Sequence, residues 1–235
     1  KENNKLILIS NGMNKITWVN FLHIYQPPWQ NKGVIDQISS ESYEYLMTLF
    51  EKYPNFRASL NITGNLVEQL DNYRPDLLKR LQVLVNKGHI ELTSSSKYHA
   101  LLPRISKSEI KRQIELNQET LAQYFDLDKI KGFYMPEMAY SDDVAKIVKK
   151  MNFEWIILDP INYKDNIEED VLYINKKTKL KVVFRNRAIS KAYPAEVIYK
   201  KLKQNAPSET IVTGSDGEIY GHFHEDWQGH IEKIL

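Results

Sequence analysis

No cysteine occurs in the 235 residues of the sequence. Disulfides, thiol nucleophiles and thiolate metal sites are therefore excluded. An excess of one charge is also missing, because 32 basic residues stand against 30 acidic ones and give a formal net charge of +2. The lysines are scattered rather than gathered in a stripe, so the chain gives no indication of a nucleic-acid partner or an anionic membrane surface.

Long apolar runs are absent as well. The first segment of the chain contains only Leu6-Ile7-Leu8-Ile9 as a continuous apolar run, which is too short for the core of a signal peptide or for a transmembrane helix. Hydrophobic residues still make up 42% of the sequence, and a chain of this length buries a substantial core. We therefore expect one domain over residues 1–235 and a cytoplasmic location.

The chain is organised around residues 131–140, Lys-Gly-Phe-Tyr-Met-Pro-Glu-Met-Ala-Tyr. The short apolar and aromatic run predicts a buried strand, which a proline ends directly before Glu137. Residues 141–151 begin with a serine cap and carry apolar residues at helical spacing. A second strand over residues 154–158 follows and ends at Asp159. This βαβ pattern places an acidic residue at the end of each strand.

Apolar segments alternate with helical patterns along most of the chain, which predicts an α/β fold. Strands are predicted over residues 16–22, 56–62, 89–93, 131–135, 154–158, 180–184 and 210–213, and residues 171–174 pair with 180–184 as a hairpin. Helices are predicted over residues 43–50, 75–87, 106–124, 142–151 and 195–202. We therefore expect about seven parallel strands in a barrel or a large open sheet.

Most polar clusters lie in or directly after a predicted strand. They surround His23, Glu91, Glu137, Asp159, Arg185 and Asp216. The loops at the carboxyl ends of parallel strands converge on one mouth, where α/β proteins place their chemistry. We therefore expect these residues to meet there. For a single acid such as Glu137, the alternative is a helix cap or a surface residue that happens to follow a strand.

The densest acidic motif is Asp216-Gly217-Glu218-Ile219-Tyr220-Gly221-His222. In an extended chain Asp216 and Glu218 point to the same side, although Ser-Asp-Gly is also ordinary turn chemistry. Cleavage of a glycosidic bond requires two carboxyl groups, one to protonate the leaving oxygen and one to attack or to activate water. Glu137 and Asp216 supply such a pair. Aromatic side chains can stack on the faces of sugars, although aromatic residues near strand ends more often belong to the core. The candidates beside these acids are Tyr25, Trp29, Tyr98, Tyr134, Tyr140 and Tyr220.

Histidines raise the alternative of a metal site. His222 and His224 would present both rings on one side of a strand, and His23 and His99 follow other strands. No helical His-Glu-x-x-His motif is present, however, and a lone histidine near a strand is more often a hydrogen-bonding residue than a ligand. We therefore expect neither a metal nor another cofactor.

Taken together, four separated motifs resemble those of glycoside hydrolase family 57, over a span from Trp18 to Trp227. In the family's order they are His23-Ile24-Tyr25-Gln26-Pro27, then Gly88-His89-Ile90-Glu91 with His99 and Leu102-Pro103, then Gly132-Phe133-Tyr134-Met135-Pro136-Glu137, then Asp216-Gly217-Glu218-Ile219-Tyr220-Gly221-His222. Two aromatic substitutions depart from the family pattern. Tyr25 stands where the family has a second histidine, and Tyr134 stands where it has tryptophan.

The resemblance implies an incomplete seven-stranded (β/α) barrel with its active site at the C-terminal ends of the parallel strands. It also implies a retaining enzyme that acts on α-glucans, with Glu137 as nucleophile and Asp216 as acid/base. The candidate substrate-binding residues are His23, Gln26, Trp29, Glu91, His99, Tyr134, Asp159, Glu218 and His222. For Asp159, an ion pair with Arg185 that braces the mouth is favoured over a contact with sugar. The helical region that follows the barrel in the family is not among the 235 residues.

The resemblance carries a geometric expectation. The two carboxyl groups of a retaining enzyme face each other at about 5–6 Å, and a wider separation indicates inversion. Either water or a sugar hydroxyl is then the acceptor. Two alternatives stay open: a metal-dependent carbohydrate deacetylase on a similar barrel, with His222 or His224 among its ligands, and a glycan-binding module without turnover.

Overall fold

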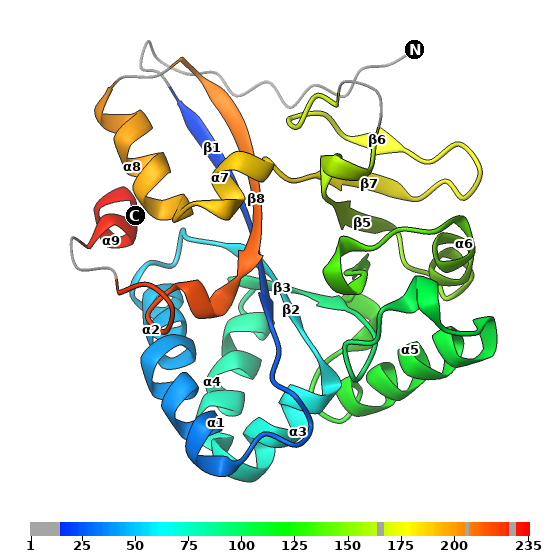
Figure 1. Ribbon diagram of the computed structural model, residues 1–235. Coiled ribbons are helices and arrows are strands. Elements are labelled where there is room, and N and C mark those ends of the chain that lie inside the picture. The colour runs from blue at the N-terminus through cyan, green and yellow to red at the C-terminus, as the bar shows by residue number, and fades with distance from the viewer. Residues whose placement is uncertain (1–14, 164–166, 205–206, 226–228) are drawn as a thin grey trace.

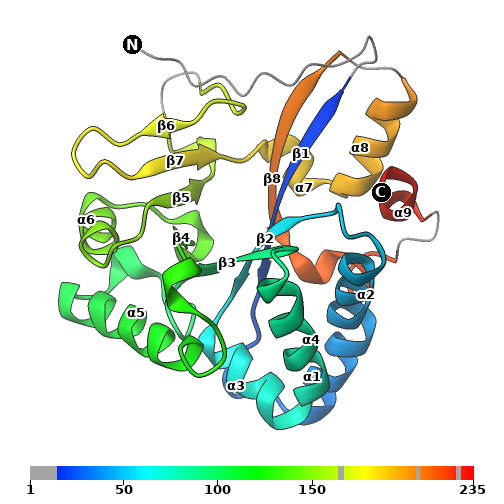
Figure 2. The same ribbon diagram turned by 180° about the vertical axis from the view of Figure 1, so that it is seen from behind.

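The computed structural model describes residues 15–163, 167–204, 207–225 and 229–235, so the apolar run Leu6–Ile9 and Trp227 lie outside the described residues. Within these ranges the strands form one sheet in the order β6-β7-β5-β4-β3-β2-β1-β8. Figures 1 and 2 show helices α1 to α4 gathered along one side of this sheet and α5 with α6 along another. The predicted α/β class is confirmed.

The sheet is parallel except at one edge. Its strands are β1 (Ile16–Ile24), β2 (Ala58–Ile62), β3 (Ile90–Ser94), β4 (Gly132–Phe133), β5 (Trp155–Leu158), β6 (Tyr173–Ile174), β7 (Lys181–Phe184) and β8 (Glu209–Asp216). Only β6 runs antiparallel to its neighbour, pairing Tyr173 with Val182 in the hairpin that the sequence predicts. The carboxyl ends of the other strands therefore lie at one edge, because parallel strands all point the same way.

The sheet ends at β8 on one side and at β6, beyond β7, on the other, and the barrel is incomplete because β8 and β7 are not paired along their length. Near their carboxyl ends two contacts bridge the seam. The backbone N–H of Asn186 donates to the carbonyl of Val212 at 2.7 Å, and Arg185 donates to the carbonyl of Gly214 at 2.6 Å. The seam is therefore held together at the end of the sheet where the acidic residues lie.

Helices cover the outer face of the sheet. The α-helices are α1 (Lys32–Ile38), α2 (Glu44–Lys52), α3 (Gly64–Tyr73), α4 (Pro75–Asn86), α5 (Lys107–Leu121), α6 (Asp142–Lys150), α7 (Arg187–Lys191), α8 (Pro194–Lys203) and α9 (His230–Ile234), and a π-helical turn, η1 (Ser39–Tyr43), joins α1 to α2. Ser106 and Ser141 cap α5 and α6, as their positions in the sequence predict. None of the helices in the described ranges is long and apolar enough to cross a membrane.

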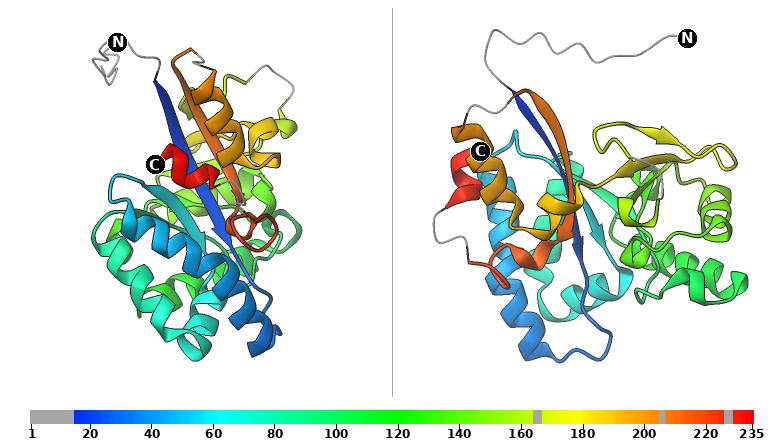
Figure 3. Two further views of the ribbon diagram at one scale, coloured as in Figure 1. Left: turned by 90° about the vertical axis from the view of Figure 1, so that its left-hand side faces the viewer. Right: turned by 45° about the horizontal axis from the view of Figure 1, so that its top comes forward.

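The two faces of the sheet have different cores, because side chains alternate along a strand. On β1, Leu22 and Ile24 join the large cluster that packs the sheet against the helices. Phe21 points to the concave side, in a small cluster with Tyr134, Met138, Ile157 and Val212. At the β1–β8 edge, α7 and α8 form a third cluster with β8, and α9 packs against it (Figure 3). The concave side is therefore filled by a thin apolar layer beneath the carboxyl ends of the strands.

The observed helices differ from the predicted ones in several places, and the short helices α7 and α9 were not predicted. The helix predicted over residues 43–50 begins at Lys32, because α1, η1 and α2 follow one another without a break. The helix α3 was not predicted, because polar residues lie on its buried face. There Asn65 donates to the carbonyl of Gln26 at 2.7 Å, so a buried amide replaces the apolar residue that a periodicity argument needs.

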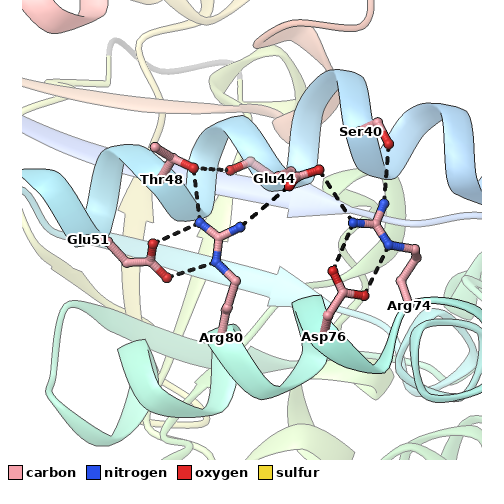
Figure 4. Close-up of polar contacts among 7 residues, drawn as sticks. All are labelled: Ser40, Glu44, Thr48, Glu51, Arg74, Asp76 and Arg80. Carbon is pink, nitrogen blue, oxygen red and sulfur yellow. Dashed lines mark hydrogen bonds and ion pairs between the residues drawn. The ribbon is translucent and has the colours of Figure 1, made fainter.

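Two arginines tie α2 to the start of α4 (Figure 4). Arg80 donates twice to Glu51, at 2.8 Å each. Arg74 donates twice to Asp76, at 3.1 and 2.9 Å, and also contacts Glu44 at 3.4 Å. The pairs are partly exposed, so each contributes about 0–1 kcal/mol. They orient α2, which follows directly on the π-helical turn η1.

Candidate active site

A cavity of about 190 Å³ opens at the carboxyl ends of the strands. It is lined by His23, Tyr25, Gln26, His99, Glu137, Asp216, Glu218 and Phe223. Of the remaining hollows among the described residues, one of about 350 Å³ lies near the N-terminal ends of the strands, beside Trp18 and Arg57, and contains no carboxylate side chain. The smaller cavity, which has three carboxyl groups in its lining, is therefore the candidate site for acid/base chemistry.

An unusual backbone turn places Glu137 at this cavity. It follows Pro136 at the end of β4 and has φ 57° and ψ 18°, in the left-handed region. Met138 is left-handed too, with φ 50°. Such conformations cost about 1–3 kcal/mol each for residues other than glycine. The result is that Met138 is buried in the concave cluster while the Glu137 side chain is 72% exposed.

Asp216 is the last residue of β8 and lies beside His23 in the register with β1. Its surface is open to the cavity, yet the surrounding protein, together with the negative charge of Glu137, raises the pKa of its carboxyl group. The charge of Arg185 opposes this rise. A carboxyl group with a raised pKa keeps its proton to higher pH and can act as an acid.

Five stacked rings form the wall of the cavity. Starting from the cavity side, Tyr25 stacks on His99 at 4.6 Å, His99 on His23 at 4.7 Å, His23 on Tyr134 at 4.6 Å, and Tyr134 on Phe21 at 5.4 Å between centroids. The stack joins β1 and the loop after β3 to the strand that carries Glu137. Aromatic stacking of this kind fixes ring orientation as well as burying area.

His23 is held as a neutral ring in this stack. Burial, with the neighbouring His99, lowers the pKa of His23 to about 3. Asn61 donates to the carbonyls of Thr93 and Ser94 at 3.1 and 3.3 Å, so its oxygen faces His23 Nδ1 at 2.8 Å. His23 Nδ1 therefore carries the proton, and Nε2 is left as an acceptor for a hydroxyl group.

His99, within the ring stack, faces the carboxylate of Glu137. Its Nε2 lies 3.9 Å from Glu137 Oε1 and has no hydrogen-bond partner in the described part of the chain. Its backbone is left-handed, with φ 53°. Burial lowers the pKa of His99, and the charge of Glu137 partly offsets this effect. Two of the five left-handed residues other than glycine in the described ranges, Glu137 and His99, thus line the same cavity.

Glu218 lies beneath Asp216 and is 4% exposed. Its Oε1 accepts a hydrogen bond from Tyr43 at 2.5 Å and longer ones from Gln26 and the backbone of Tyr25, both at 3.4 Å. Burial raises the pKa of Glu218 to about 7, and these donors only partly counter the rise. Glu218 is therefore a buried acid that ionises near neutral pH.

The π-helical turn η1 holds the loop after β8 through three successive residues. Glu41 contacts His222 Nδ1 at 2.5 Å, Ser42 donates to the carbonyl of Gly217 at 3.1 Å, and Tyr43 binds Glu218. Gly221 has φ 103°, and a Cβ there would lie 1.9 Å from the carbonyl oxygen of Glu41. Only glycine therefore permits this close approach.

The structure brings together most, but not all, of the predicted site residues. His23, Gln26, His99, Glu137, Asp216 and Glu218 line the cavity, and Tyr134 supports it through the ring stack. Trp29 is 82% exposed on the loop after β1. His222 faces Glu41 rather than the cavity.

Two predicted sugar contacts lie elsewhere. Glu91 is the second residue of β3, at the opposite end of the strand, where it accepts hydrogen bonds from Ser59 and Trp155 at 3.2 and 3.3 Å. Asp159 is 4% exposed and forms an ion pair with Arg185 at 2.6 Å, which is the bracing role that was favoured for it. Neither residue lines the cavity.

Three residues of the site were not predicted. Phe223 is 68% exposed and lines the cavity, and its place directly after His222 was the available signal. Asn61 is a lone amide inside an apolar strand, a pattern that often marks a hydrogen bond to a functional group. Tyr43 gave no signal, because its spacing fits the apolar face of a helix.

The histidines do not form a metal centre in the described ranges. No group of three or more His, Cys, Asp or Glu side chains is placed to hold a metal ion there. His224 stacks on Tyr193 at 4.1 Å between centroids and binds the backbone of Glu225. The two rings of the His222 and His224 pair are thus engaged separately.

Replacing Glu218 with glutamine is expected to change how stability depends on pH. A folded-state pKa of about 7, against 4.5 for an ordinary glutamate, means that the unfolded chain releases this proton first as pH rises. As pH rises from the unfolded-state pKa to the folded-state pKa, the free energy of unfolding therefore falls by up to about 3 kcal/mol. The variant lacks this loss, so it should match the wild type near pH 4 and gain stability over it towards pH 8.

Urea unfolding at several pH values measures this difference directly. Glu119→Gln, on the exposed side of α5, is the control for removing a carboxylate. A constant difference between the Glu218 variant and the wild type across the pH range would contradict a raised pKa.

Comparison with known proteins gives consistent matches. Residues 15–234 match the sequence family described as "Glycosyl hydrolase family 57". The chain is 24% identical over 240 residues to an alpha-amylase of Pyrococcus abyssi (strain GE5 / Orsay), covering 94% of this chain and 35% of that protein. It is 22% identical over 237 residues to a 4-alpha-glucanotransferase of Thermococcus litoralis, covering 94% of this chain and 35% of that protein.

The fold matches as well. The crystal structure of the 4-alpha-glucanotransferase from Thermococcus litoralis is similar with a TM-score of 0.74 and 19% identity, over 87% of this chain and 33% of that chain. The chain thus spans about a third of the length of these relatives. At this identity the structural likeness establishes the fold, and the predicted incomplete barrel is confirmed.

Proposed function

The chain belongs to glycosyl hydrolase family 57, and on that premise we propose that it is a retaining enzyme that cleaves or transfers α-glucans. The observation that supports this most is the single cavity that contains both Glu137 and Asp216. One carboxyl group is largely exposed and ready to attack, and the other has a raised pKa that favours its protonated form. Two carboxyl groups in different environments are what acid and nucleophile roles require.

The reaction proceeds by double displacement. A carboxylate oxygen of Glu137 attacks the anomeric carbon, the glycosidic C–O bond breaks, and the proton of Asp216 passes to the leaving oxygen. A covalent ester between Glu137 and the sugar results. Asp216, now ionised, takes a proton from water or from a sugar hydroxyl, whose oxygen attacks the anomeric carbon and releases Glu137. After the two steps together, Glu137 is again a carboxylate and Asp216 is again protonated.

The surrounding residues are suited to hold a sugar ring. The neutral His23 offers Nε2 as an acceptor for a hydroxyl group, and His99 Nε2, a buried atom, lies beside Glu137. Phe223 and Trp29 are exposed aromatics near the mouth, a type of surface that stacks on sugar faces. We infer that Gln26 and Glu218, which are joined by a hydrogen bond, together support the acid/base residue Asp216 from beneath.

We propose that the whole chain acts as one catalytic barrel domain. A cytoplasmic location and an α-glucan as the substrate are further parts of this proposal. The expected separation of about 5–6 Å between the two carboxyl groups stays a prediction.

Product analysis with maltoheptaose tests the proposal. The chain is expected to form maltooligosaccharides whose new reducing ends first appear as the α-anomer in proton NMR spectra, because two displacements restore the configuration. The rate should be the same with and without a chelator. Products longer than the substrate would identify a sugar as acceptor, whereas shorter products alone would identify water.

Product analysis and two companion assays distinguish the alternatives. Release of acetate from chitooligosaccharides that stops on chelation would identify a metal-dependent deacetylase. Products that first appear as the β-anomer would indicate inversion. Binding of oligosaccharides without any product would indicate a glycan-binding module.

A further inference from the structure

The Asp159 carboxylate is buried between two arginines at the end of β5. Arg185 donates to Asp159 Oδ2 from Nε at 2.8 Å and contacts it from a second nitrogen at 2.6 Å. Arg187 contacts the same oxygen at 2.7 Å. The other oxygen accepts the backbone N–H of Ile161 at 2.9 Å. Asp159 is 4% exposed, so its hydrogen-bonding capacity is used within the protein rather than for a ligand.

Only one of the two arginines continues across the seam of the barrel. Arg185 also donates to the carbonyl of Gly214 at 2.6 Å, two residues before Asp216 on β8. A Cβ on Gly214 would lie 3.5 Å from the Cδ of Arg185, so the arginine stem lies against this part of the strand. The ion pair thus ends beside the strand that carries the acid/base residue.

Several charged or titratable groups face Asp216 from the elements around it. Glu137 after β4 raises its pKa, and Arg185 after β7 is the one cation in the described ranges whose charge acts to lower it. Glu218 on the following turn, Tyr134 after β4 and Tyr43 on η1 interact electrostatically with Asp216 as well. Arg185 is therefore the group whose charge must be balanced if Asp216 is to keep a proton.

We propose that Asp159 is a positioning residue for the reaction: it fixes the Arg185 guanidinium against β8 and offsets part of its charge, so that Asp216 stays protonated until the leaving oxygen takes the proton. Once that proton has left and Glu137 is bound to the sugar as an ester, the guanidinium limits the cost of the negative charge on Asp216. The inference deepens the proposed function and rests on Asp216 as its acid/base.

The signs of two substitutions follow from this arrangement. Asp159→Asn leaves the Arg185 charge unbalanced, so the pKa of Asp216 should fall, by about one unit. Arg185→Gln removes the cation, so the pKa of Asp216 should rise by a similar amount. Arg187→Gln is the matched control, because Arg187 binds Asp159 and, within the described ranges, forms no hydrogen bond or ion pair with β8, and it should leave the pKa of Asp216 within about 0.3 units.

The pKa of Asp216 is measured without turnover, by NMR titration of protein labelled with ¹³C at aspartate carboxyl groups. The Asp216 resonance is identified as the one that disappears in Asp216→Asn. A downward shift in Asp159→Asn and an upward shift in Arg185→Gln, with Arg187→Gln unchanged, would support the proposal. If Asp159→Asn does not fold, the Arg185→Gln titration tests the same balance alone.

Other results overturn the proposal. An unchanged Asp216 pKa in both Asp159→Asn and Arg185→Gln would show that the ion pair only braces the seam. An equal shift in Arg187→Gln would show that the effect belongs to the net charge of the region and not to Arg185. Since the readout needs no substrate, a chain that fails to turn over α-glucans would count against the proposed function and leave this measurement intact.

Discussion

Replacing Glu137 with alanine is expected to lower kcat for maltoheptaose by at least about 10⁴-fold, because the other two carboxyl groups in the cavity lining have different roles: Asp216 is the acid/base, and Glu218 is 4% exposed. Azide should restore turnover of α-maltosyl fluoride by the variant. A small anion fits the space left by the side chain, and fluoride leaves without needing a proton. Direct attack by azide displaces fluoride from the opposite face, so the product is expected to be β-maltosyl azide, which proton NMR identifies.

Glu91→Gln is the matched control for this experiment. Glu91 was expected to hold sugar, but it lies at the opposite end of β3, bound to Ser59 and Trp155. The variant is therefore expected to keep kcat within about threefold of the wild type. If Glu137→Ala kept comparable activity, or if azide gave the α-product in that variant, Glu137 would not be the nucleophile.

The location of the site was predictable because it follows from the direction of the strands. The chain places Glu137 and Asp216 directly after apolar runs, and parallel strands bring such positions to one edge of the sheet. The proline before Glu137 lies three residues beyond the end of β4, which covers only Gly132–Phe133 of the strand predicted over residues 131–135, and Ser141 marked the next helix. These are local signals, so they needed no knowledge of which elements pack together.

The interactions that tune the site were beyond local signals. Tyr43 and Glu218 are 175 residues apart in sequence, and their hydrogen bond depends on how η1 meets the loop after β8. Whether Glu91 can reach the cavity depends on where β3 begins. Because β3 begins at Ile90, Glu91 lies near the N-terminal end of the strand, away from the cavity. Left-handed backbone at Glu137 was equally unpredictable, because glutamate rarely adopts it.

Replacing Asp216 with asparagine is expected to affect substrates according to how readily they lose their leaving group. For maltoheptaose, whose leaving sugar oxygen needs a proton, kcat should fall by about 10²–10⁴-fold. For α-maltosyl fluoride the first step needs no acid and should proceed at a rate close to that of the wild type. The second step still lacks its base, so the glycosyl ester on Glu137 should accumulate and be visible by mass spectrometry of the intact protein.

Azide then distinguishes this variant from the Glu137 variant. In Asp216→Asn it attacks the ester on Glu137 without needing a base, so α-maltosyl azide is expected, the opposite anomer from that of Glu137→Ala. Opposite anomers from the two variants would assign one carboxyl group to each role, because a single displacement inverts the configuration and two displacements retain it. The same anomer from both, or an equal loss of activity on maltoheptaose and on the fluoride in Asp216→Asn, would mean that Asp216 supports the cavity and does not transfer the proton.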